Sequence, residues 1–294
     1  MKVYVPCHIT SIFYPVEKRL ELREVGSRGV GFVLDKGVLT YVKCKPSSIS
    51  RIRVYSNGKR IKDCVSQRVV EDILRKFKLQ RDVEVYHEFS LPVGYGYGIS
   101  GACSLGTSLS LLKELSIPFT YNLACEFAHV AEVKERTGLG DVVAESVGGI
   151  VIRRKEGSLR TGIVDKLFEN GYILSAYLDE PIYTKDIIDD EDFRKNIEWS
   201  GKVYLERFLS SPTLSNLMIF SKRFAKSSGL MSEELEELCK EVEKGAIGSS
   251  MCMIGNSVFS VFKNAKEAEE IVDSFENAFI TKIRNRGAEI VEDT

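Results

Sequence analysis

The sequence predicts a two-domain protein of the α+β class. The chain has 294 residues, of which 44% are hydrophobic, which is enough to fill the cores of two ordinary domains. The first half carries β-like runs, whereas from about Asp165 the composition shifts toward long charged helices and ends in a β-α-β pattern. We therefore expect an N-terminal domain over residues 1–164 and a C-terminal α+β domain over residues 165–294.

Short strand-like runs dominate the N-terminal part of the chain. They are VYVP, GVGFVLD, GVLTYVKCK, ISRIRVYSNGKRI and DVEVYHEFSLP, and glycine and charged residues separate them. Asn57-Gly58 between two alternating runs predicts a tight hairpin. Between the runs, VSQRVVEDILRKFKL repeats apolar residues at the spacing of one face of a helix. This helix precedes the strand that leads into a glycine-rich stretch.

Two helices are predicted after the glycine-rich stretch. Leucines repeat along residues 105–115, and a second pattern extends from Tyr121 to about Arg136, with Thr120 as N-cap and Gly138 as terminator. Glu132 shares a face of the second helix with small apolar residues, so this carboxylate requires an explanation. TGLGDVVAESVGG then predicts a turn that presents Asp141, and GGIVIRRKEG predicts a strand.

The C-terminal part alternates predicted helices and strands. In SSPTLSNLMIFSKRF, Ser211 and Pro212 have the pattern of a helix N-cap and first helical residue. SEELEELCKEVEKG predicts a charged helix, and SVFSVFK predicts a strand. Asn264 and Glu267 have capping-box spacing at the start of another helix, and AFITKIRNRGAEIV supplies further strands.

The composition favours a small-molecule partner. With 41 basic and 42 acidic residues, the net charge of -1 gives no reason to expect nucleic acid or an anionic membrane. Seven scattered cysteines without a C-x-x-C pair indicate reduced thiols in a cytoplasmic protein. Pro6, His8 and Pro15 interrupt any signal-peptide pattern, and no apolar run approaches the length of a membrane span. The sequence leaves a homodimer open.

The stretch from Leu91 to Leu115 is the main functional signal in the sequence. It places several glycines and the Ser100 hydroxyl between a predicted strand and a predicted helix. Free backbone N–H groups at a helix start, together with the helix dipole, form an anion site that suits phosphate. Glycine allows the backbone to approach a ligand closely.

Three interpretations of these glycines compete. Gly96-Tyr-Gly98-Ile-Ser-Gly101 matches the dinucleotide-binding fingerprint, but no acidic residue follows about 20 residues later to bind a ribose. A P-loop is excluded because no Gly-Lys-Ser/Thr follows. The glycines could also serve only turns and tight helix packing. The third interpretation is a phosphoryl-transfer site of another design.

Residues Pro92 to Gly101, with the pattern P-x-G-x-G-x-G-x-S-G, resemble the second motif of the GHMP kinase superfamily of small-molecule kinases. VPCHITSIFYP and KGAIGSSMCMIGNSVFSVF lie where this superfamily has its first and third motifs, and TGLGD resembles its segment with a catalytic Asp. The resemblance implies an N-terminal nucleotide-binding domain of the ribosomal protein S5 domain 2-like fold and a C-terminal ferredoxin-like α+β domain. The active site would lie between the two domains.

The resemblance also implies ATP and Mg²⁺ as cofactors and assigns roles to residues. Asp141 would be the catalytic Asp, and Ser100 and Glu132 would be Mg²⁺ ligands, which suits their hard oxygen atoms. Asp141 could instead only cap the helix that follows it. The nucleotide would contact residues of the second and third motifs, namely Pro92, Gly94, Gly96, Gly98, Ser100, Gly101, Gly248, Ser249 and Ser250.

Within the superfamily, four segments are similar to the archaeal pantoate kinases: PCHIT, GSRGVG, AEVKERTGLGDVVAESVGG and MIGNSVF. This similarity implies ATP-dependent phosphorylation of the 4-hydroxyl of pantoate on the archaeal route to coenzyme A. His8 would then be a catalytic residue that contacts the substrate or Asp141, and Thr10 would contact the substrate. The substrate carboxylate needs a guanidinium, for which Arg28 is the first candidate and Arg153 the second.

Other functions remain open at this stage. His8 stands where the wider superfamily commonly has Lys or Arg. It could also be an ordinary buried histidine without a role in the reaction. Two alternatives follow: a kinase of the same superfamily for another small hydroxy acid or polyol, and a nucleotide-binding regulator without turnover. Ser100, Glu132 and Asp141 together favour an enzyme, because a protein that only binds nucleotide has no need of Asp141.

Overall fold

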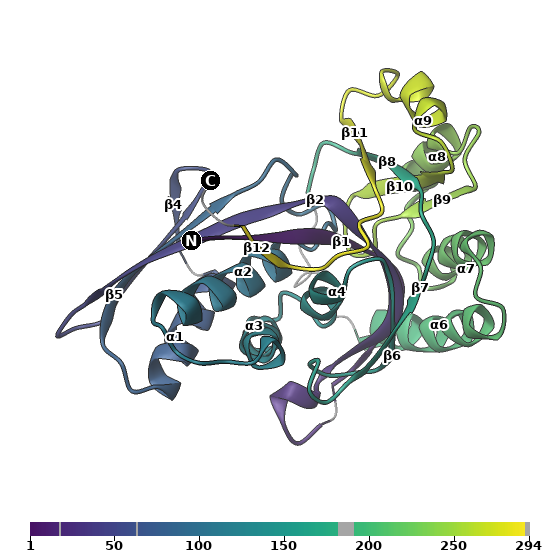
Figure 1. The fold of residues 1–294 in the computed structure, drawn as a ribbon. Helices are drawn as coiled ribbons and strands as arrows, with labels where there is room; N and C mark the ends of the chain where they lie inside the picture. Colours follow the sequence, from purple (N-terminus) through teal and green to yellow (C-terminus); the bar gives the residue numbers. More distant parts are fainter. Residues whose placement is uncertain (18, 63, 182–190, 292–294) are drawn as a thin grey trace.

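The computed structural model describes residues 1–17, 19–62, 64–181 and 191–291. Within them, the strands form one eight-stranded sheet and one four-stranded sheet, and the two sheets lie side by side (Figure 1). The α+β class predicted from the sequence is confirmed. None of the helices in the described residues is long and apolar enough to cross a membrane.

The first sheet is built around two long strands that pair along their length. Its strands are β1 (Lys2–Val16), β2 (Gly26–Pro46), β3 (Arg51–Ser56), β4 (Lys59–Ile61), β5 (Arg81–Glu88), β6 (Ile150–Lys155), β7 (Ile163–Leu167) and β12 (Glu289–Val291). The order is β12-β1-β2-β5-β3-β4, and β6 pairs with β2 and β7. A single 3-10 turn, η1 (Leu22–Glu24), lies in the connection from β1 to β2.

The sequence predicted several short strands where the structure has these two long ones. Pro6 does not end β1, because the register shifts between Pro6 and His8 and the strand continues beyond this irregularity. A second shift lies between Thr10 and Ile12. The hairpin predicted at Asn57-Gly58 is confirmed: Ser56 pairs with Lys59, and both turn residues have positive φ.

Helices α1 (Val65–Lys76), α2 (Ile99–Glu114), α3 (Tyr121–Glu135) and α4 (Asp141–Val147) follow the predicted pattern and pack on one face of the first sheet (Figure 1). The Thr120 cap is confirmed, since its hydroxyl accepts from the N–H of Leu123. The predicted terminator Gly138 is wrong. The chain turns earlier, at Arg136, which adopts the left-handed conformation with a φ of 56°.

The second sheet has the order β11-β8-β10-β9, from strands β8 (Tyr172–Tyr177), β9 (Gly248–Met251), β10 (Ser257–Phe262) and β11 (Ala278–Lys282). Helices α7 (Leu214–Ser227), α8 (Glu233–Val242) and α9 (Ala265–Val272) pack on this sheet, whereas α6 (Glu191–Ser210) packs on α7 and on β1 of the first sheet. The sequence did not predict the internal strand β8, whose residues YILSAY follow the shift toward charged helices. The predicted start of α7 is also wrong, because Thr213 and not Ser211 accepts from a backbone N–H at the helix start.

The end of the chain returns to the first sheet, where β12 pairs with β1. Strand β7 ends at Leu167 and still belongs to the first sheet, whereas β8 opens the second sheet at Tyr172. The division between residues 164 and 165 stays a prediction. The two sheets would support a boundary a few residues later, with β12 added to the first domain.

Candidate active site

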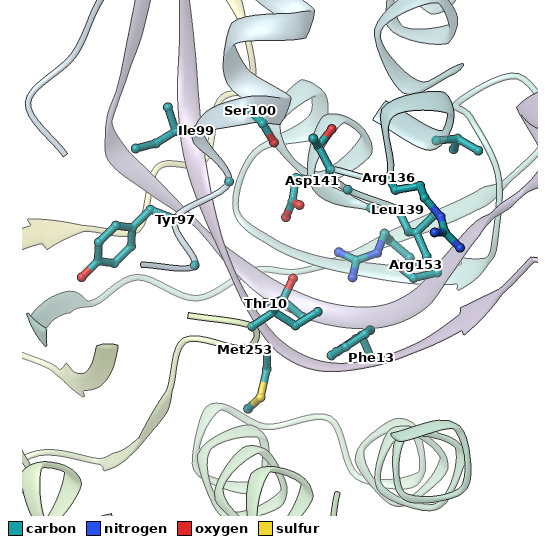
Figure 2. Close-up of a pocket in the computed structure, with 18 of the residues that line it drawn as sticks. Thr10, Phe13, Tyr97, Ile99, Ser100, Arg136, Leu139, Asp141, Arg153 and Met253 are labelled. Atoms are coloured by element: carbon teal, nitrogen blue, oxygen red, sulfur yellow. The ribbon is translucent and has the colours of Figure 1, made fainter. Parts of the chain in front are cut away.

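A cavity of about 240 Å³ opens where the glycine-rich loop meets the start of α4 and strand β1. Figure 2 shows side chains from these segments converging on it. Of the site residues predicted from the sequence, seven line the cavity: Thr10, Gly94, Gly96, Gly98, Ser100, Asp141 and Arg153.

The loop of residues 89–98 that connects β5 to α2 needs its glycines. Gly94, Gly96 and Gly98 have φ values of 91°, 80° and 68°, a conformation that other residues rarely adopt. A Cβ on Gly98 would lie 2.6 Å from Oε1 of Glu145. The loop delivers the first turn of α2 to the cavity, where unpaired N–H groups and the helix dipole favour an anion.

Ser100 lies in the first turn of α2 and contacts Glu132 of α3. Its hydroxyl donates to Oε2 of Glu132 at 3.1 Å, and Thr137 donates to Oε1 at 2.8 Å. Glu132 is 1% exposed. Burial and the nearby charge of Asp141 raise the pKa of Glu132 to about 8, although the two hydrogen bonds act in the opposite direction. A buried carboxylate of this kind favours a bound cation.

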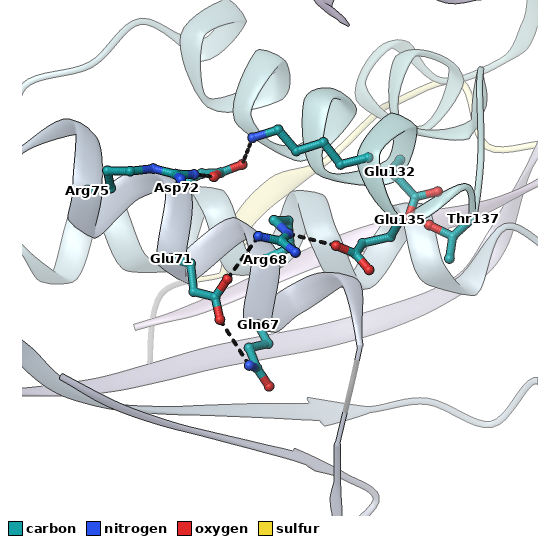
Figure 3. Close-up of polar contacts among 9 residues, drawn as sticks. Gln67, Arg68, Glu71, Asp72, Arg75, Glu132, Glu135 and Thr137 are labelled. Atoms are coloured by element: carbon teal, nitrogen blue, oxygen red, sulfur yellow. Dashed lines mark hydrogen bonds and ion pairs between the residues drawn. The ribbon is translucent and has the colours of Figure 1, made fainter.

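Ion pairs between helices α1 and α3 hold the end of α3 that carries Glu132 (Figure 3). Arg68 of α1 donates to Glu135 at 2.6 Å, and Lys134 donates to Asp72 at 2.7 Å. These two ion pairs fix α3 against α1, and the Glu132 carboxylate is thereby held beside Ser100.

Asp141 is the first residue of α4 and pairs with His8 of β1. Its Oδ1 lies 2.8 Å from Nδ1 of His8, which is completely buried, whereas the Asp141 side chain remains 23% exposed toward the cavity. The His8 ring lies against Gly31 of β2, where a Cβ would clash with it. A side chain at position 31 would therefore displace the histidine.

The protonation states of this pair follow from burial. Burial lowers the pKa of His8, an effect that outweighs the neighbouring Asp141. For Asp141, burial acts to raise the pKa, but the hydrogen bond to His8 and the charge of Arg153 act in the opposite direction, and the pKa lies below the ordinary value. Since Nε2 of His8 has no partner among the described residues, a neutral ring that donates from Nδ1 fits best. Asp141 is then an ionised carboxylate facing the cavity.

Arg153 of β6 supplies a buried guanidinium to the cavity. The residue is 2% exposed, and its Nε and Nη1 atoms have no hydrogen-bond partner among the described residues. Burial lowers the pKa of Arg153, whereas the charge of Asp141 raises it. The guanidinium fits because Gly29 and Gly140 lie against it; added Cβ atoms would be 3.1 Å and 2.6 Å from its nitrogen atoms. A buried guanidinium with open donors is suited to an anionic ligand.

The chain is similar to known proteins over nearly its whole length. A pantoate kinase of Thermococcus kodakarensis is 34% identical over 275 residues, which cover 92% of this chain and 90% of the relative. The chain belongs to the pantoate kinase family. Family models for the GHMP kinases N terminal domain and the GHMP kinases C terminal domain match residues 64–149 and 206–281.

Two further comparisons agree with this membership. A pantoate kinase of Methanocaldococcus jannaschii is 30% identical and covers 96% of this chain and 99% of its own. A solved structure titled "Phosphotransferase related to CoA biosynthesis pathway" is 32% identical, with a TM-score of 0.86 over 98% of both chains. The GHMP kinase fold predicted from the sequence is thereby confirmed.

Some of the residues that the sequence predicted for the active site do not line the cavity. Arg28, the first candidate for the substrate carboxylate, instead donates its Nε to Glu156 at 2.6 Å. Pro92 lies outside the lining, and Gly101 packs in the first turn of α2 against Asp141 and Glu145. His8 and Glu132 do not line the cavity either: His8 contacts the lining residue Asp141, and Glu132 contacts the lining residues Ser100 and Thr137.

The third motif approaches the cavity a few residues later than the sequence predicted. Gly248, Ser249 and Ser250 are buried in strand β9 and do not line the cavity, and the Ser249 hydroxyl donates to Glu243. Met253 and Ile254, in the turn after β9, line it instead. The turn lies there because Gly255 packs directly on the backbone of Tyr95 and Gly96.

Sequence reasoning also missed the purpose of the glycines in GSRGVG. Gly29 and Gly31 are two residues apart, so they lie on one face of β2 and leave room for Arg153 and His8 from the neighbouring strands. Glycine repeated on one face inside a strand was the available signal. Ser27 and Arg136 also line the cavity and were not predicted.

Glu145 packs against Gly98 and Gly101, and its buried carboxyl group should make the stability of the protein depend on pH. It is completely buried in α4, and neither carboxylate oxygen has a partner among the described residues. Burial and the charges of Asp141 and Glu132 hold its pKa well above the usual value. The folded protein therefore keeps this proton at pH values at which the unfolded chain releases it.

Replacing Glu145 by Gln should change how stability depends on pH. Above the pKa of an ordinary carboxyl, the unfolded wild type releases this proton and the folded wild type keeps it. The free energy of unfolding of the wild type therefore falls by about 1.4 kcal/mol for each pH unit. Glu145→Gln has no such proton. Its free energy of unfolding relative to wild type should therefore rise by about 1.4 kcal/mol per pH unit, from pH 5 up to the pKa of Glu145 in the folded protein. Urea unfolding without nucleotide or metal measures it, with the exposed Glu114→Gln as control. Equal slopes in all three proteins would show that Glu145 is ionised.

Proposed function

We propose that this protein transfers the terminal phosphoryl group of ATP to the 4-hydroxyl of pantoate, on the archaeal route to coenzyme A. Relatives named pantoate kinase cover almost the whole chain. The observation that carries the proposal is the placement of Asp141 and Arg153 in one cavity beside the glycine loop (Figure 2). Pantoate has a hydroxyl for the first residue and a carboxylate for the second.

Asp141 acts on the hydroxyl that attacks the phosphoryl group. Its ionised carboxylate can accept the hydroxyl proton or orient the hydroxyl toward the phosphate. The hydrogen bond from the neutral His8 ring keeps one carboxylate oxygen in place. His8 is thus a positioning residue, which explains why a histidine suffices where the wider superfamily commonly has a cation.

Arg153 binds the substrate carboxylate in this proposal, in place of Arg28. Arg153 lines the cavity, and its Nε and Nη1 atoms have no hydrogen-bond partner among the described residues, whereas Arg28 is paired with the buried Glu156. Thr10, which lies below Asp141 in Figure 2, and Ser27, next to Arg153, supply hydroxyl groups to the substrate. Positioning by these groups lowers the entropic part of the barrier.

ATP and Mg²⁺ fit the other half of the site. The glycine loop and the start of α2 offer N–H groups to the triphosphate, and Ser100 and Glu132 place two hard oxygen atoms 3.1 Å apart. The described residues contain no cluster of three or more metal-binding side chains. Mg²⁺ keeps several waters and takes few protein ligands, so Ser100 and Glu132 could hold it. The metal would spread the charge of the transferred phosphoryl group.

Replacing Glu132 by Gln should raise the Mg²⁺ concentration needed for half-maximal activity by at least about tenfold, because a charged ligand is lost. Mg²⁺ titration of the kinase rate at saturating ATP and pantoate measures this effect. Glu135→Gln is a matched control on the same helix, since Glu135 pairs with Arg68, whereas Glu132 accepts from Ser100. An unchanged Mg²⁺ requirement in Glu132→Gln would remove Glu132 from the metal site.

ATP consumption with pantoate, homoserine, mevalonate and galactose tests the function. Turnover of pantoate alone is the expected result. Turnover of another compound would identify a different kinase of the same superfamily. No turnover with any of the four would favour a nucleotide-binding regulator.

We propose a cytoplasmic location, which the seven free cysteines support because thiols persist in reducing compartments. A homodimer remains a proposal, and sedimentation of the purified protein would test it.

A further inference from the structure

Phe13, Gly29 and Arg153 form one row across three strands of the first sheet. Phe13 of β1 pairs with Gly29 of β2, and Gly29 pairs with Arg153 of β6. Residues directly opposite each other in a sheet have their side chains on the same face. The aromatic ring and the guanidinium therefore share a face, and the residue between them has no side chain.

The bulge in β1 directs Phe13 to this face. Side chains three residues apart in a regular strand, such as those of Thr10 and Phe13, would lie on opposite faces. The register shift between Thr10 and Ile12 adds one residue and reverses this alternation. Both Thr10 and Phe13 consequently line the cavity.

Phe13 forms a firm apolar surface in the cavity. The residue is 8% exposed, and its ring packs edge-on against Phe224 of α7, with ring centroids 5.7 Å apart. Val25, Met253 and Ile254 continue the apolar lining. In Figure 2 the ring lies across the cavity from Asp141, so charged groups and an apolar surface face each other.

The chemistry of pantoate matches this arrangement. Between its carboxylate end and its terminal hydroxyl it has a carbon that bears two methyl groups. When Arg153 holds the carboxylate and Asp141 meets the hydroxyl, this carbon lies between them, in the part of the cavity that Phe13 lines. We propose, on the basis of the proposed function, that Phe13 determines specificity by packing against the two methyl groups and so selects pantoate over unbranched hydroxy acids.

The first test compares pantoate with the same acid without its methyl groups, 2,4-dihydroxybutanoate, on the wild-type enzyme. We expect kcat/KM to be about 10- to 100-fold higher for pantoate, the range for two methyl groups that move into an apolar pocket. Turnover of neither acid would contradict the proposed function. Equal turnover of both would overturn only the role of Phe13.

The second test measures the same ratio in two variants. Phe13→Ala should lower the ratio to within a few-fold of one, mainly by slowing pantoate turnover. Phe224→Ala is the matched control, because it removes the other ring of the same aromatic pair and Phe224 does not line the cavity; it should leave the ratio near that of the wild type. Phe13→Leu, which keeps an apolar side chain, should retain most of the selectivity and serves if Phe13→Ala does not fold. An unchanged ratio in Phe13→Ala, or the same loss in both alanine variants, would overturn the inference.

Discussion

Replacing Asp141 by Asn should lower kcat by about 10²- to 10⁴-fold, the usual contribution of a positioned acid or base. The substitution removes the charge and leaves an amide of the same shape at the start of α4. Because the glycine loop and the start of α2 are untouched, ATP should bind almost as before. Steady-state kinetics with pantoate and ATP, together with calorimetric titration of ATP, measure both effects.

The pH profile provides the control for this prediction. The pKa of Asp141 is held below its ordinary value of 3.8, so the ionised form is lost only as the pH falls below that range. The wild type should therefore show no loss of kcat due to Asp141 between pH 5 and 8. Wild-type turnover in Asp141→Asn would exclude Asp141 from the mechanism, and loss of ATP binding would assign it a structural role.

Replacing Arg153 by Gln should lower kcat/KM for pantoate by about 30- to 1000-fold, the range for removing one partner of a buried charge pair. Most of the effect should appear in KM for pantoate, and KM for ATP should change little. Arg153→Lys should recover only part of the loss, since an ammonium cannot reproduce the paired N–H groups of the guanidinium.

Arg28→Gln distinguishes the two arginines that the sequence offered. Arg28 pairs with the buried Glu156 and lies outside the cavity, so KM for pantoate should stay within a few-fold of wild type, with some loss of stability. If Arg28→Gln raised KM for pantoate as strongly as Arg153→Gln, the carboxylate site would have to include the face of β2 that carries Arg28.

The sequence was most informative where the chemistry is local. Within the glycine loop, positive φ requires glycine, and Ser100 follows directly in the first helical turn. Glu132 was notable because it shares a helix face with small apolar residues, and that face is buried. Each of these inferences needs only a few neighbouring residues and a known periodicity.

The sequence was less informative where strand geometry decides. Arg28 and Arg153 both lie on strands near glycines, and only the pairing of Arg153 with Gly29 shows which guanidinium enters the cavity. The bulge that directs Phe13 inward has no clear signature in the sequence. In the third motif, the residues that line the cavity lie later in the chain than the sequence predicted. Strand β9 buries Gly248 and its neighbours, and the turn that follows β9 lies next to the glycine loop.

The return of the chain to the first sheet has a consequence for how the enzyme matures. Gly149 donates its N–H to the carbonyl of Arg284, and Gly287 packs on the backbone of Glu145 and Ser146 at the end of α4. This segment is synthesised after the whole second sheet, whose last strand ends at Lys282. A nascent chain that already contains Asp141 therefore lacks the support at the far end of its helix. The Asp141 carboxylate should reach its final position only after residues 284–287 have left the ribosome, which would delay activity until after the second sheet has been synthesised.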